Sequence, residues 1–202
     1  MEAPDRFVGE IAGAGTASGT RLVVGRWPTS PFGAIADAMI EDADGRRVLI
    51  APRPEVAAYI GGVYDFDDVV VTDVVATREP GRLGFHGGPL DVELAVGRRD
   101  ALGWLLRVVP RSIATTPAWA TIVDPVARTA LRGVRTRGTT PGGDEYYGVT
   151  DRHRIVAAVT TWGGADLGPL CAVVPPVRFG FSSVPRRPSI VAVTTTVRPR
   201  PR

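Results

Sequence analysis

The sequence predicts a mainly β protein of the α+β type, in which about ten strands form an antiparallel barrel-like or strongly curved sheet. Two observations support this fold class. Most of the chain consists of short apolar or alternating stretches separated by Gly, Pro or Asp-Gly, whereas one stretch near residues 99–132 has helical spacing. Strong curvature or closure would protect the edges that so many short strands otherwise expose.

The first half of the chain contains most of the expected strands. Asp42-Ala-Asp-Gly45 joins two of them in a hairpin, because Asp-Gly tolerates the positive φ that a tight turn needs. A short helix is expected over residues 54–60, with Pro54 at its start and Gly61-Gly62 at its end. The expected strands span residues 6–12, 20–27, 34–41, 46–51, 68–77, 82–86 and 90–96.

The middle of the chain is expected to be a helical insertion. Thr116 and Asp124 each precede a proline, a pattern that caps and begins a helix, so two short helices are predicted after the first one. The first helix is predicted over residues 100–109 by the spacing of Leu102, Leu105, Leu106 and Val109.

The last part of the chain returns to strands. Residues 145–150 and 155–162 are expected to form a second hairpin, followed by strands over 177–182 and 189–197. We expect one domain over residues 1–202, with frayed tails at residues 1–5 and 198–202.

The composition excludes several kinds of chemistry. The chain has 24 arginines and no lysine, asparagine or glutamine. Lysine is needed for a Schiff base or a P-loop, and side-chain amides are needed for an amide oxyanion hole or N-glycosylation. A GC-rich genome explains these absences through codon usage. Whatever the cause, every basic group is a planar, permanently charged guanidinium suited to carboxylates and phosphates.

The arginines are unevenly placed. Residues 98–137 contain eight arginines and two acids, whereas the rest of the chain carries a net negative charge. This basic segment could cap the barrel, dock an acidic partner or an anionic membrane with Trp104 and Trp119 as anchors, or bind phosphates. The cap is the simplest interpretation. We do not expect nucleic acid as a partner, because no recognised binding module is present.

Asp37 is the best candidate for an interior acid. The alanines of residues 34–41 share one face of the predicted strand, and Asp37 shares the other with Ile35 and Met39. A carboxyl among apolar neighbours is either half-exposed or a polar group in a pocket with a raised pKa.

A second pair of candidate catalytic residues is Asp151 and His153. If the chain stays extended, both share a face with Tyr147, and Asp151 could orient His153 as a general base. The simpler interpretation is a solvated turn between two strands.

Several residues could line a ligand pocket. Aromatic and apolar side chains would form its walls, and an arginine would bind an anionic group; the ordinary alternative is core packing with an arginine that reaches solvent. The candidates are Trp27, Met39, Tyr147, Arg178 and Phe181.

No cofactor, metal site or transmembrane segment is expected. His86, His153 and Cys171 are not at ligand spacing, and no apolar run approaches the roughly 18 residues that span a bilayer. The N-terminus lacks the apolar core of a signal peptide, so we expect a cytoplasmic protein.

Three stretches resemble those of uncharacterised proteins from GC-rich actinobacteria. They are Arg26–Gly33, Tyr64–Phe66, and Val177–Phe181 followed by Pro185–Pro188. The resemblance implies a bacterial, cytoplasmic origin and no particular activity.

The sequence therefore leaves three hypotheses about function. The first is a β-barrel that binds a small, largely apolar or anionic ligand. The second is an enzyme that uses Asp37 or the Asp151/His153 pair for acid–base chemistry on such a ligand. The third is an interaction module that docks an acidic partner or membrane surface through residues 98–137.

Overall fold

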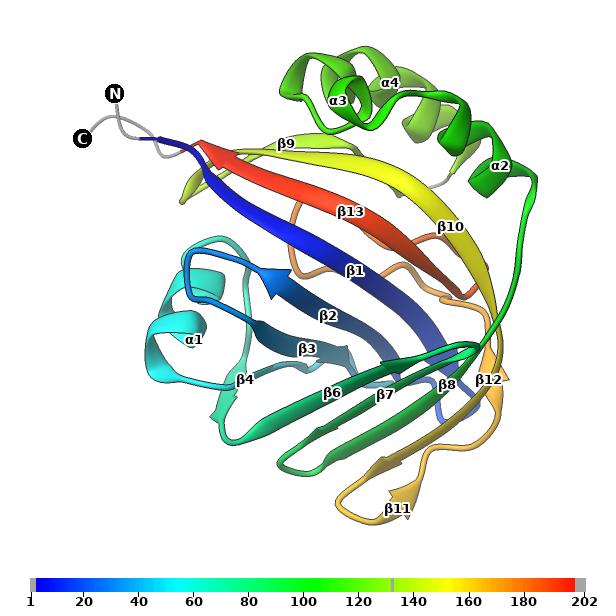
Figure 1. The fold of residues 1–202 in the computed structure, drawn as a ribbon. Coiled ribbons are helices and arrows are strands. Elements are labelled where there is room, and N and C mark those ends of the chain that lie inside the picture. The colour runs from blue at the N-terminus through cyan, green and yellow to red at the C-terminus, as the bar shows by residue number, and fades with distance from the viewer. Residues whose placement is uncertain (1–2, 132, 199–202) are drawn as a thin grey trace.

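The computed structural model describes residues 3–131 and 133–198, and its central feature is one curled β-sheet. Ten strands follow one another in the order β5-β4-β3-β2-β1-β13-β10-β8-β7-β6, and β9, β11 and β12 pair at its margins. The sheet forms a half-barrel (Figure 1), which confirms the predicted fold class. Neighbouring strands are antiparallel except for the parallel pair β4 and β5.

The strands and helices have the following bounds. The strands are β1 (Asp5–Thr16), β2 (Arg21–Thr29), β3 (Ile35–Glu41), β4 (Arg47–Ala51), β5 (Asp68–Val71), β6 (Val74–Glu79), β7 (Arg82–Gly87), β8 (Leu90–Arg99), β9 (Arg137–Thr140), β10 (Gly143–Trp162), β11 (Ala165–Asp166), β12 (Leu170–Cys171) and β13 (Ser189–Arg198). The helices are α1 (Pro54–Gly61), α2 (Ala101–Val108), α3 (Arg111–Ala114) and α4 (Pro117–Ala130).

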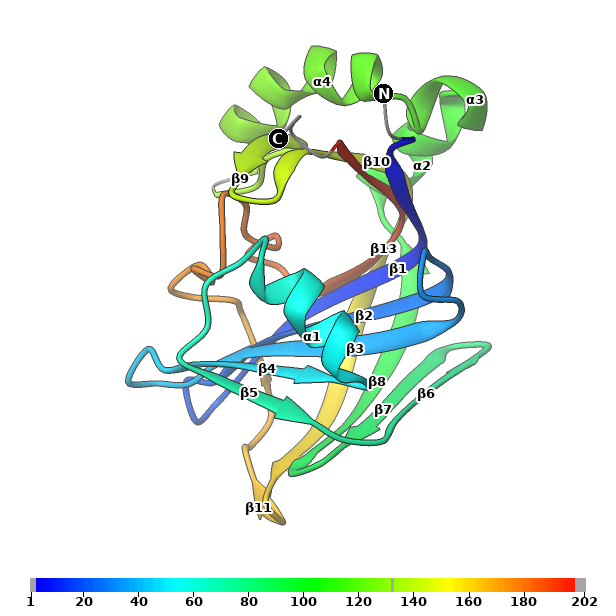
Figure 2. The ribbon, with the colours of Figure 1, turned by 90° about the vertical axis from the view of Figure 1, so that its left-hand side faces the viewer.

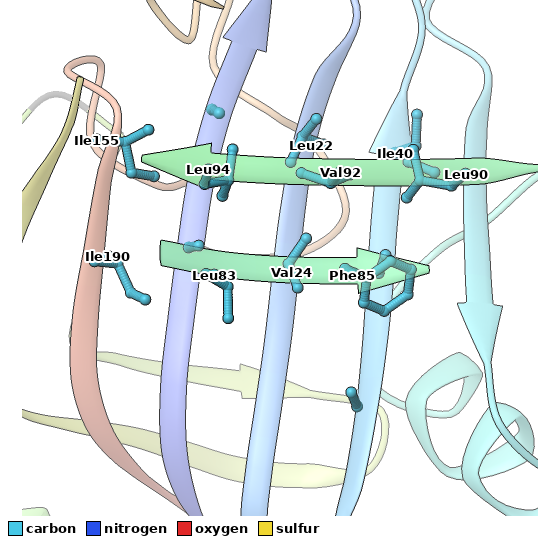
Figure 3. Packing of buried hydrophobic residues seen from close by; sticks show 14 of the residues in the cluster. Leu22, Val24, Ile40, Leu83, Phe85, Leu90, Val92, Leu94, Ile155 and Ile190 are labelled. Carbon is cyan, nitrogen blue, oxygen red and sulfur yellow. The ribbon is translucent and has the colours of Figure 1, made fainter. Parts of the chain in front are cut away.

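The main core lies between two parts of the same sheet. Strands β7 and β8 cross over β1, β2 and β3, and their apolar side chains meet between the two layers (Figure 3). Leu22, Val24 and Leu94 are among the members of this cluster with less than 1% exposure. Ala36, Ala38 and Ile40 of β3 point into this layer, on the face opposite Asp37, as the alternation predicts.

The other face of β1, β2, β3, β10 and β13 is covered by helices and by the irregular segment between β12 and β13. Helices α2, α3 and α4 lie together at one end of the sheet, over β9 and β10 (Figures 1 and 2). We call these three helices, residues 101–130, the helical cap. They correspond to the predicted helical insertion.

An ion pair and a glycine at the start of α2 contribute to holding this helix on β10. The Asp100 carboxylate accepts the Gly103 backbone N–H at 2.9 Å and so caps α2, while its other oxygen lies 2.8 Å from Nη1 of Arg152. Gly103 itself sits where any Cβ would come within 2.2 Å of the Arg152 carbonyl oxygen. This close approach requires glycine at that position.

The predicted turn at residues 151–154 is wrong. Residues 143–162 form one continuous strand, because β13 pairs with them on one side and β8 on the other. The charges that suggested a turn are neutralised inside the sheet: Arg99 binds Asp151 through two nitrogens at 2.7 and 2.8 Å, and Asp100 binds Arg152.

Other boundaries also differ from prediction. Asp124-Pro125 lies inside α4 and does not begin a helix; the Asp124 carboxylate accepts the backbone N–H of Thr136 at 2.9 Å instead. Residues 68–77 divide into β5 and β6, and residues 177–182 form no strand. Asp5 and Arg198, assigned to frayed tails, pair in β1 and β13, whereas residues 1–2 and 199–202 lie outside the described residues.

Candidate functional site

A large cavity lies between the concave face of the sheet, the helical cap and the segment between β12 and β13. Its volume is about 740 Å³, within the range of small-molecule sites. Its walls are almost wholly apolar. They come from β1, β2, β3, β10 and β13 on one side, from α2 and α4 on another, and from Val177 and Phe179 on the third.

Asp37 projects from β3 into this cavity. Its side chain is 3% exposed, and Oδ1 accepts a hydrogen bond from Nε1 of Trp27 at 2.8 Å. Burial raises the pKa of Asp37 from 3.8 to about 7, and the Trp27 hydrogen bond opposes that rise only in part. Among the described residues no group hydrogen-bonds Oδ2, which leaves one carboxyl oxygen for a ligand.

The sheet register allows this pair to form. Gly25 lies opposite Asp37 in the β2–β3 ladder. A Cβ at Gly25 would lie 2.6 Å from both the Asp37 Oδ1 and the Trp27 Nε1. Glycine therefore provides the space in which the carboxyl and the indole meet.

A second buried acid, Glu145, projects from β10 and also lines the cavity. Its two carboxyl oxygens lie 2.8 and 3.0 Å from the Tyr64 hydroxyl, which is 2.5 Å from the Tyr147 hydroxyl. Burial raises the pKa of Glu145 to about 7 and raises those of Tyr64 and Tyr147 well above their ordinary values. At neutral pH the tyrosines are therefore neutral hydrogen-bond donors.

Glu145 and Tyr64 were not among the site residues predicted from the sequence. Glu145 could have been found by parity, because Glu145 and Tyr147 occupy the same face of one strand, as Asp37 and Met39 do. Tyr64 could not have been found from a strand pattern, because it lies in the irregular segment after α1 and is 81 residues from Glu145 in the sequence.

Further polar atoms lie in the cavity wall. Arg152 Nε, Arg135 Nε and Thr195 Oγ1 are buried and have no hydrogen-bond partner among the described residues. Burial lowers the pKa of Arg152, although its nearby partner Asp100 opposes that change. An apolar wall with a few unused polar atoms is the usual composition of a ligand pocket.

The other two candidate catalytic residues lie outside the cavity lining. Asp151 is bound by Arg99, and Arg107 approaches within 3.6 Å, so hydrogen bonding from Arg99 lowers the pKa of Asp151. His153 Nε2 lies 3.7 Å from Asp151 Oδ2, and its Nδ1 lies 3.1 Å from the Gly97 carbonyl oxygen. These contacts connect the helical cap to β8 and β10.

The candidate ligand-binding residues divide into two groups. Trp27, Met39 and Tyr147 line the cavity. Arg178 points away and is 70% exposed; its Nε donates to Glu41 at 3.0 Å. Phe181 stacks on Tyr147 with ring centroids 5.6 Å apart, so it supports the cavity wall from behind.

Within residues 3–131 and 133–198, no cluster of three or more His, Cys, Asp or Glu side chains could hold a metal ion. No helix in that part of the chain is long and apolar enough to cross a membrane.

Comparison with protein-family models and with curated protein sequences finds no match. Among solved structures, the fold is similar to a crystal structure of acetoacetate decarboxylase from Legionella pneumophila. The TM-score is 0.46 at 10% sequence identity, over 98% of this chain and 86% of that one. A likeness of this extent supports no inference about activity.

Proposed function

We propose that this protein binds a small, largely apolar molecule with one hydrogen-bonding group in the cavity. The observation that carries the proposal is the combination of a 740 Å³ apolar cavity with buried Asp37, whose Oδ2 has no partner among the described residues. A ligand that hydrogen-bonds Oδ2 would supply a partner for a carboxyl oxygen in an apolar cavity wall, where an unmade hydrogen bond costs free energy.

The buried acids favour an apolar ligand over an anionic one. Asp37 and Glu145 both line the cavity, and an anion beside them would keep both carboxyls protonated or be repelled by their charge. Two arginines line the cavity: Arg152 is already paired with Asp100, and Arg135 is half-buried, with an Nε that has no partner among the described residues.

The proposal is tested by titration with the neutral fluorescent probe N-phenyl-1-naphthylamine. Saturable binding at one probe per chain is expected, because the cavity encloses the probe and removes it from water. Ala127→Trp should abolish binding, because Ala127 lines the cavity from α4 and an indole there fills it. Ala118→Trp is the matched control, since Ala118 is exposed on the same helix and does not line the cavity. Non-saturable binding, or equal binding by both variants, would contradict the proposal.

Asp37 also supports a second candidate function, which is proton transfer to or from the bound molecule. A general acid or base works best when its pKa is near the working pH, and burial places the pKa of Asp37 at about 7. Asp37 would remove a proton from the carbon next to a ligand carbonyl and return a proton to the same carbon.

This activity can be measured as deuterium exchange into 2-nonanone in heavy water, followed by NMR. Wild-type protein should accelerate exchange, and Asp37→Asn should reduce the rate by roughly two to four orders of magnitude. Glu79→Gln, which changes an exposed acid on β6, is the control. Exchange equal to the protein-free rate would reject proton transfer and leave ligand binding intact.

A further inference from the structure

The helical cap exposes an unusual number of large apolar side chains. We call this set the docking face; it consists of Trp104, Leu105, Val108, Ile113, Ile122 and Val126. Val108 is 77% exposed and Ile122 is 67% exposed. Trp104 and Val108 occupy successive turns of α2, as Ile122 and Val126 do on α4, so each helix presents an apolar stripe to the outside. Large apolar side chains exposed together on neighbouring helices are characteristic of an interaction site.

The docking face is continuous with the cavity. Leu105, Val108 and Val126 are exposed to solvent and also line the cavity, so they form part of its rim. An apolar molecule that leaves the cavity over this rim would contact the docking face first.

The exposed charged side chains of the helical cap are all arginines. Arg107, Arg111 and Arg128 are exposed on the helical cap. Asp124 is the only acid among residues 101–131, and it is buried, with its carboxylate bound to backbone N–H groups of Thr136 and Arg137. Arg107 lies 3.6 Å from the Asp151 carboxylate, whereas Arg111 and Arg128 have no ion-pair partner among the described residues. The surface of these helices thus combines exposed aliphatic groups with guanidinium charge that is available to a partner.

We propose that the helical cap docks on an anionic lipid membrane surface, with the arginines at the phosphates and the docking face among the upper acyl chains. An acidic protein would match the arginines but would leave much of the aliphatic surface in water, whereas a lipid interface matches both. Docking would place the cavity rim against the acyl layer. Passage of an apolar ligand over this rim would rest on the proposed ligand binding, whereas docking itself does not.

Vesicle co-sedimentation of the full chain tests the proposal. Binding is expected to equal mixtures of phosphatidylglycerol and phosphatidylcholine, with weaker binding to phosphatidylcholine alone and at high salt. Arg111→Gln and Arg128→Gln should each weaken binding roughly fivefold, as the loss of one interfacial charge predicts. Arg154→Gln, which removes an exposed arginine from β10, should have no effect.

A second set of variants tests the contribution of the apolar side chains to vesicle binding. Trp104 and Ile122 are exposed and do not line the cavity. Trp104→Ser and Ile122→Ser therefore test docking without changing the ligand site. Each should weaken vesicle binding by about tenfold. Val159→Ser, which changes a 66% exposed valine at the far end of β10, should not.

Three results would overturn docking. They are equal binding to both kinds of vesicle, no loss in the docking-face variants, or self-association in analytical ultracentrifugation that Ile122→Ser abolishes. The last result would assign the face to a second copy of the chain. Because the vesicles contain no probe, failure of docking would leave saturable binding of N-phenyl-1-naphthylamine intact, and the two proposals can fail separately.

Discussion

Asp37 shows how one buried residue connects folding with pH. Its pKa rises from 3.8 to about 7 on folding, so the folded protein holds a proton that the unfolded chain has lost between those pH values. The free energy of unfolding should therefore fall as the pH rises from about 4 to about 7, by on the order of 4 kcal/mol from this residue. Glu145 contributes in the same direction, because its pKa also rises to about 7.

The measurement is urea unfolding at a series of pH values. Asp37→Asn should flatten the decrease over this range, because the amide does not titrate. Glu79→Gln, on the exposed edge of the sheet, should leave the wild-type slope unchanged. A slope that Asp37→Asn does not alter would show that Asp37 titrates normally in the folded protein.

Trp27 should affect the pKa of the Asp37 carboxyl. Its indole N–H donates to Asp37 and lowers the pKa of that group, so Trp27→Phe should move the pKa of Asp37 upward from about 7. Carbon-13 NMR titration of the Asp37 carboxyl measures this directly. Trp104→Phe, which alters an exposed tryptophan on α2, should cause no shift; an unchanged or lower pKa in Trp27→Phe would contradict the hydrogen bond.

At the scale of elements, the attachment of α2 depends on Gly103. Alanine is normally favoured over glycine in a helix by up to about 1 kcal/mol. At Gly103 the added Cβ would meet the Arg152 carbonyl oxygen at 2.2 Å, so Gly103→Ala should destabilise the protein by roughly 1–3 kcal/mol and increase hydrogen exchange in α2. Gly61→Ala in α1 meets open space and should be neutral or stabilising. Equal effects in urea unfolding would show that α2 does not pack closely on β10.

At the scale of the whole molecule, a ligand bound in the cavity should stabilise the folded protein. A probe that binds only the folded state should stabilise it by about 2.7 kcal/mol at roughly one hundred times its Kd. Thermal unfolding with N-phenyl-1-naphthylamine should therefore show a higher Tm for wild type and Ala118→Trp, and no change for Ala127→Trp. A Tm that rises equally in Ala127→Trp would place the probe outside the cavity.

Local sequence patterns determined a large part of the architecture. Turn signals divided the chain into strands, and alternation placed the alanines of β3 and Asp37 on opposite faces. Helical spacing placed the insertion between β8 and β9. These features depend on near neighbours along the chain, so the sequence alone contains them.

Tertiary pairing decided what local patterns could not. The charges of Asp151 and Arg152 favour a turn when only the local sequence is considered. In the fold, Arg99 and Asp100, some 50 residues earlier, neutralise these charges, and the strand continues through them. The hydrogen bond between Tyr64 and Glu145 also joins residues 81 positions apart in the sequence, so only the fold brings them together. The enclosure of Asp37 by strands, the helical cap and the segment before β13 likewise raises its pKa, since desolvation depends on every element around a group and not on its neighbours in sequence.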